Sequence, residues 1–94
     1  MKMILIVIDE AKKEELEVFL NRSGVVGYTE LDRARGSGAT GPRLGSAAFP
    51  RTSAVFFTFL EDDALDRLRS GVEEFCDACG ERLKMFAWGA ERIF

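Results

Sequence analysis

The sequence predicts a single ferredoxin-like α+β domain over residues 1–94, a two-layer sandwich with two helices on one face of an antiparallel sheet. Three observations predict this class. The chain has 94 residues, the size of one compact domain. Two strongly apolar runs, residues 2–8 and 53–60, are typical of buried strands. Each run precedes a segment with helical spacing of its apolar residues, so the predicted order is βαββαβ.

The first half of the chain contains a strand, a helix and a weaker strand. Asp9 follows the first apolar run and is expected to cap the helix after it. Ser23-Gly24 is typical of a glycine helix end. Residues 25–35 alternate apolar and polar side chains, which indicates a half-exposed strand.

Residues 36–52 are rich in glycine, serine and alanine, for which we predict a long flexible loop. Loops of this length inside compact domains are usually functional or disordered. The loop is also unusual in charge. Residues 33–52 contain four arginines and no acid, although the whole chain has a formal net charge of −3. The acidic balance disfavours nucleic acid as a partner.

The second half repeats the pattern of the first. Asp62 or Asp63 is expected to cap a helix that Gly80 ends, and residues 83–88 form the last predicted strand. Residues 90–94 extend that strand or form a short separate piece.

The two apolar strands carry large apolar residues on both faces, although the helices can cover only one. An uncovered second face would be a larger apolar patch than monomers usually expose. Burying several isoleucines and phenylalanines there is worth several kcal/mol at about 25 cal/mol per Å². We therefore expect self-association; the alternatives are a ligand on that face or a different strand register.

The composition of the chain excludes several classes of function. The chain has no histidine, which excludes Ser–His and Cys–His catalysis. Most carboxylates fall on predicted helix faces, where solvation explains them. We predict that the protein is not an enzyme. No signal peptide or membrane-spanning stretch is recognisable, so we expect a cytoplasmic protein that is not itself a membrane protein.

Residues 36–41 match the dinucleotide-binding pattern G-x-G-x-x-G. The surrounding βαβ unit that this motif requires is missing, and another glycine follows instead of a helix. The glycines can nevertheless let backbone N–H groups converge on an anion, assisted by Arg35, Arg43 and Arg51. A mobile loop whose arginines balance an acidic protein is the alternative.

Cys76 and Cys79 form a single C-x-x-C on the apolar stripe of the second helix. A tetrahedral zinc site needs two further ligands, and the chain has no other cysteine or histidine. We expect buried, inert thiols. A redox pair, or a metal site shared between subunits, is the alternative.

The order of elements, the glycine-rich residues 36–50 and the segment 84–88 together resemble the nitrogen-regulatory PII signalling family, in particular its short PII-like branch. The resemblance spans the whole chain in pattern. It implies a homotrimer whose sheets face inward, with effectors bound in clefts between subunits and a protruding T-loop that reports occupancy to a partner. Gly36 and Gly38 would lie at the loop base beside the effector, and Lys84 would contact a phosphate.

The sequence departs from the family pattern in three places. Before Lys84 only Gly80 remains of the glycine-rich phosphate-binding stretch, the chain stops at Phe94 before the arginines of other members, and the loop has no tyrosine to be modified. These departures predict a smaller anion, or an adenine nucleotide held differently.

We therefore predict a PII-like regulatory protein that signals through loop 36–52 to a transporter or enzyme target. The predicted effector site comprises Arg35, Gly36, Gly38, Arg43, Gly80 and Lys84. The main alternative is a trimeric metal-tolerance protein of the CutA kind that uses Cys76 and Cys79; an enzyme acting on a small carboxylate is a weaker rival.

Overall fold

The computed structural model describes residues 1–80 and 83–94. Its elements follow the predicted order, with a short hairpin added. They are β1 (Lys2–Asp9), a 3-10 turn η1 (Glu10–Lys12), α1 (Lys13–Arg22), β2 (Thr29–Ala34), β3 (Gly36–Gly38), β4 (Gly41–Arg43), β5 (Ser53–Leu60), α2 (Asp62–Cys79) and β6 (Lys84–Gly89).

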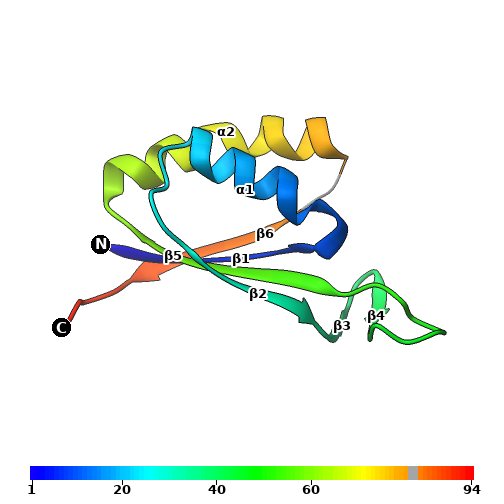
Figure 1. Cartoon of the computed structure of the whole chain (residues 1–94). Coiled ribbons are helices and arrows are strands. Elements are labelled where there is room, and N and C mark those ends of the chain that lie inside the picture. The colour runs from blue at the N-terminus through cyan, green and yellow to red at the C-terminus, as the bar shows by residue number, and fades with distance from the viewer. Residues whose placement is uncertain (81–82) are drawn as a thin grey trace.

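The main sheet has the order β2-β5-β1-β6, and neighbouring strands are antiparallel. β1 pairs with β5 along its whole length, from Lys2 opposite Leu60 to Asp9 opposite Ser53. Both helices lie on one side of this sheet (Figure 1). The ferredoxin-like α+β prediction is therefore confirmed.

The core lies between the helices and the sheet. Because side chains alternate along a strand, Ile4, Ile6 and Ile8 all point to the helix side, where they are at most 2% exposed. Phe56 of β5 is fully buried beside them. Leucines from both helices complete the cluster, and each fully buried side chain of this size contributes about 1.5–3 kcal/mol.

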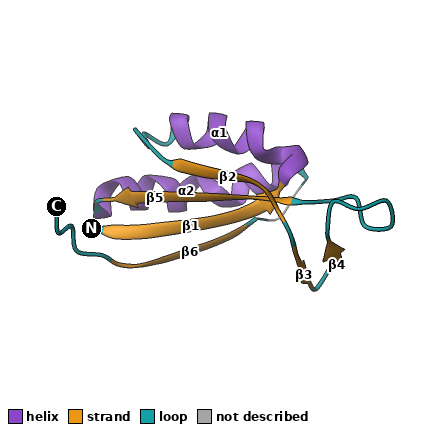
Figure 2. Ribbon diagram, turned by 60° about the horizontal axis from the view of Figure 1, so that its bottom comes forward, coloured by secondary structure: helices purple, strands orange, loops and turns teal. Residues whose placement is uncertain are grey.

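The opposite face of the sheet has no helix over it (Figure 2). Two rows of apolar side chains cross it. Leu5 lies between Phe57 and Phe86, and Met3 lies between Phe59 and Trp88. The side chains of three of them remain largely exposed in the single chain, at 57% for Phe59, 55% for Phe86 and 46% for Trp88. The predicted bare apolar face is present.

Several local predictions were correct. Asp9 caps η1, because its Oδ1 accepts a hydrogen bond from the Ala11 N–H at 2.9 Å. Gly24 and Gly80 end the two helices with φ of +83° and +73°, a region that favours glycine.

Other local predictions need correction. The predicted loop 36–52 is not wholly irregular, because β3 and β4 pair as a two-stranded sheet with Gly36 opposite Arg43. Neither Asp62 nor Asp63 caps α2. The cap position is Glu61, which makes no side-chain capping bond.

Candidate functional site

A cavity of about 440 Å³ lies at the end of the sheet where β1 finishes and the hairpin begins. It is bounded by parts of β1, β5 and β6 on one side and by the hairpin on the other. The lining residues are Val7, Ile8, Asp9, Ala34, Arg35, Gly36, Ser37, Gly38, Ala39, Thr40, Arg43, Ser53, Val55, Leu83 and Lys84.

Five of the six predicted effector residues line this cavity: Arg35, Gly36, Gly38, Arg43 and Lys84. Gly80 does not; it ends α2. The backbone at Gly36 and Gly38 is open, since a Cβ added at either position would meet no atom within 4 Å. A ligand can therefore approach the main chain there closely.

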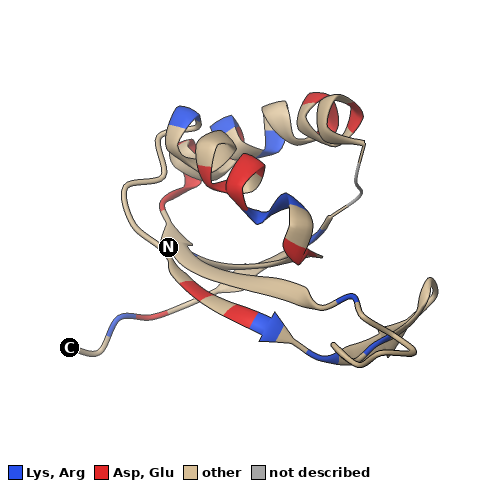
Figure 3. Cartoon of the chain, turned by 45° about the vertical axis from the view of Figure 1, so that its right-hand side comes forward, with Lys and Arg blue, Asp and Glu red and all other residues tan. Residues whose placement is uncertain are grey.

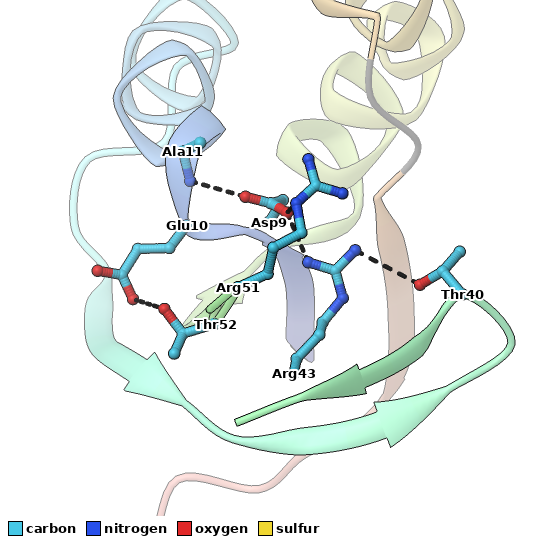
Figure 4. Close-up of polar contacts among 7 residues, drawn as sticks. All are labelled: Asp9, Glu10, Ala11, Thr40, Arg43, Arg51 and Thr52. Carbon is cyan, nitrogen blue, oxygen red and sulfur yellow. Dashed lines mark hydrogen bonds and ion pairs between the residues drawn. The ribbon is translucent and has the colours of Figure 1, made fainter. Parts of the chain in front are cut away.

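Asp9 is the acidic group of this cavity, and sequence reasoning assigned it only a capping role. Its side chain is 4% exposed. Oδ2 accepts from Arg43 Nη1 at 2.5 Å and lies 3.1 Å from Arg51 Nε (Figure 4). The unbalanced arginines of residues 33–52 were the available signal, because a buried carboxylate is the natural partner of such cations.

The same contacts determine the ionisation of Asp9. Burial raises the pKa of this carboxyl, but the hydrogen bond from Arg43, the Ala11 N–H and the charges of Arg51 and Arg43 together outweigh it. The pKa of Asp9 therefore lies below its ordinary value. The group is a carboxylate at neutral pH, with three donors already directed at it.

Glu10 joins the two ends of the loop. Its Oε1 accepts from the Arg33 N–H at 2.6 Å and from Thr52 Oγ1 at 2.9 Å, and its own N–H donates to the Thr52 carbonyl at 3.1 Å. Arg33 has φ of +57°, an unusual value for a residue with a side chain. Glu10 thus stabilises the bulge at which β2 turns toward β3.

Residues 33–52 form a basic segment, with four arginines and no acid. Figure 3 shows blue segments with no red between them from the end of β2 through the hairpin to the start of β5, whereas both colours occur on the helices. The walls of the cavity include Arg35, Arg43 and Lys84 against the single carboxylate of Asp9. The described lining is therefore net positive, which suits a small anion.

Cys76 and Cys79 lie away from this cavity. Cys76 is buried, Cys79 is half-buried, and neither forms a disulfide. Cys79 Sγ is 4.0 Å from the Cys76 carbonyl oxygen. Within residues 1–80 and 83–94, no cluster of three or more potential ligands is arranged to hold a metal ion. The metal-binding alternative gains no support from this geometry.

Comparison with known protein families identifies the family of this chain. The model of the family described as nitrogen regulatory protein P-II matches residues 1–91. The chain belongs to the P-II family. The resemblance to this family that the sequence indicated is confirmed. The family is one of regulatory proteins. No curated protein matches its sequence closely enough to count as a relative.

Solved structures support the same fold. CPII of Thiomonas intermedia K12, a nitrogen regulatory PII-like protein bound to ADP, AMP and bicarbonate, has a TM-score of 0.71 and 22% identity, covering 97% of this chain and 88% of its own. A PII-like signaling protein of Thermus thermophilus has a TM-score of 0.68 and 22% identity, covering 93% and 83% respectively. Neither α1 nor α2 of the P-II chain combines the length and hydrophobicity of a membrane-spanning helix.

Proposed function

We propose that this P-II family protein is a homotrimeric sensor. It binds a small anion or adenine nucleotide at the cavity between β1, β6 and the hairpin, and it signals through residues 36–52. The observation that carries the proposal is the meeting of Arg35, Arg43 and Lys84 around open glycine backbone in one cavity of about 440 Å³. Guanidinium, ammonium and backbone N–H groups are the donors that bind phosphates and carboxylates.

The bare sheet face supports the trimeric part of the proposal. Its exposed apolar residues need a cover, and further copies of the same chain provide one without any other component. The cavity lies at the edge of that face, since Lys84 begins β6 and pairs with Val7 of β1. Assembly would therefore bring a neighbouring subunit close to the cavity.

The similar structures suggest which effectors to try first. CPII has been solved with ADP and bicarbonate, and with ADP, AMP and bicarbonate. Both ligand types are anions, as the cavity charge requires. A bound effector changes the loop only through a difference in its affinity for two loop states.

Isothermal titration with ADP, AMP, bicarbonate and inorganic phosphate tests the proposal. Lys84 lines the cavity and no salt bridge to it is found among the described residues, so Lys84→Ala should weaken binding at least about tenfold. Arg69→Ala removes one positive charge from the exposed surface of α2 and should leave binding unchanged. Equal affinities for the two variants, or no heat with any of the four ligands, would overturn effector binding at this cavity.

A further inference from the structure

We infer that Asp9 is an internal competitor for the effector: its carboxylate occupies the anion position and holds the loop closed until an external anion replaces it. This inference rests on the proposed function and deepens it. It assigns to Asp9 the role of setting both effector affinity and loop mobility.

The geometry of the ion pairs carries the first step. Asp9 is the last residue of β1, whereas Arg43 and Arg51 belong to the segment between β2 and β5. Both arginines reach the same carboxylate oxygen, Oδ2, at 2.5 and 3.1 Å. One buried carboxylate therefore fastens the end of β4, through Arg43, and the segment just before β5, through Arg51, to the sheet (Figure 4). Loss of that carboxylate from the contact would remove the one anchor that both arginines share.

The second step concerns the match between ligand and donors. The other oxygen of Asp9 is engaged by the Ala11 N–H, so Asp9 offers the two guanidiniums a single oxygen. Bicarbonate has three oxygens and inorganic phosphate has four, so either anion can accept from a guanidinium in bidentate fashion. Arg43 also makes a longer contact, from Nη2 to Thr40 Oγ1 at 3.5 Å, which a better acceptor can replace.

The third step is the charge around the carboxylate. Asp9 is the single acid among the described lining residues, whereas Arg35, Arg43 and Lys84 are positive. An entering anion can contact Arg35 and Lys84 directly, but it gains Arg43 only in competition with Asp9. The apparent affinity of the cavity is therefore reduced by the stability of the closed state.

Asp9→Asn separates this role from the capping role. Asparagine caps a helix about as well as aspartate, so the bond to the Ala11 N–H can be kept while the charge is removed. Amide hydrogen exchange of residues 43–52, measured without added anions, should become at least about tenfold faster in this variant. Titration with ADP and with inorganic phosphate should show binding about tenfold tighter than in the unchanged protein.

Two further variants complete the experiment. Asp9→Ser also retains a cap without the charge and should behave as Asp9→Asn does. Asp66→Asn removes an exposed carboxylate of α2 and should change neither exchange nor binding, which controls for net charge.

The outcomes separate the two proposals. If amide hydrogen exchange of residues 43–52 is unchanged in both folded Asp9 variants, Asp9 does not hold the loop closed. If exchange is faster but the variants bind anions no more tightly than the unchanged protein, Asp9 does not compete with the effector. If the unchanged protein and every variant bind none of the anions, the proposed function fails, and the exchange measurement still decides whether Asp9 holds the loop.

Discussion

At the scale of single residues, Glu30 of β2 is a partly buried carboxyl crowded by other carboxyls. Its Oε1 is buried without a hydrogen-bond partner among the described residues, and its Oε2 is 3.6 Å from Lys13 Nζ. The neighbouring carboxyls of Glu17 and Asp32, together with burial, raise the pKa of Glu30 to about 7. A proton on Glu30 supplies the donor that this crowded group lacks.

The raised pKa makes stability depend on pH. The folded state holds the Glu30 proton more tightly than the unfolded chain, in which the ordinary value is 4.5. This stabilisation is fully present below pH 4.5 and is lost as pH rises through about 7. Glu30→Gln imitates the protonated form, so it should raise the free energy of unfolding by roughly 1 kcal/mol at pH 8 and by much less at pH 4.5.

Urea unfolding at fixed protein concentration checks this prediction, because assembly would make stability depend on concentration. Glu14→Gln, an exposed change on α1, is the control and should give the same difference at both pH values. A Glu30→Gln effect that does not change between pH 4.5 and 8 would show that Glu30 ionises normally.

Two features of single residues could not be predicted from the sequence. The arginine-rich composition of residues 33–52 identified a basic segment, but it could not show that Asp9 is the buried partner, because ion pairs distant in sequence depend on the fold. The positive φ of Arg33 could not be predicted either, since nothing in the local sequence requires it. Only the contact with Glu10 explains how it is held there.

At the scale of elements, the packing of α1 on α2 explains why a glycine lies inside a helix. Gly71 lies inside α2, where alanine would be favoured by about 1 kcal/mol. A Cβ at Gly71 would lie 3.0 Å from Cε1 of Phe19. The Phe19 ring also stacks on Phe75, with centroids 4.8 Å apart. The glycine leaves room for this ring.

Gly71→Ala should therefore lower the free energy of unfolding by about 1 kcal/mol despite the better helix propensity. In a Phe19→Leu background the ring is removed, and the same change should stabilise the protein relative to Phe19→Leu alone. Thermal or urea unfolding of the four proteins of this double-mutant cycle measures the coupling. A Gly71→Ala effect that is the same in both backgrounds would mean that the ring does not limit the helix contact.

Elements were predicted well where one physical signal dominated. Strands β1 and β5 and both helices follow directly from apolar runs and helical spacing, which tertiary contacts reinforce. The hairpin β3–β4 was missed because each strand has only three residues and neither carries a large apolar side chain, so no side-chain periodicity indicates it. Its turn depends on Gly41, which has φ of +102°.

At the scale of the whole molecule, the two faces of the sheet differ in how they are covered. The helices bury Ile4, Ile6, Ile8 and Phe56 on one face. The other face keeps Phe59, Phe86 and Trp88 largely exposed in a single chain. The sequence predicted this asymmetry from strands that are apolar on both sides. It could not predict that the basic cavity lies at the edge of that face, because the position of the hairpin is a property of the fold.

The exposed face leads to a prediction about assembly. In sedimentation velocity at micromolar concentration the protein should have the mass of a trimer. Phe86→Asp places a charge on the β6 side of the apolar face, where burial would cost several kcal/mol, and should shift the mass to that of the single chain. Val26→Asp alters a residue that is 101% exposed before β2 and should leave the trimer intact. A single-chain mass for the unchanged protein would show that this face is not covered by further copies. The cavity would then have to bind its anion without residues from a neighbouring subunit.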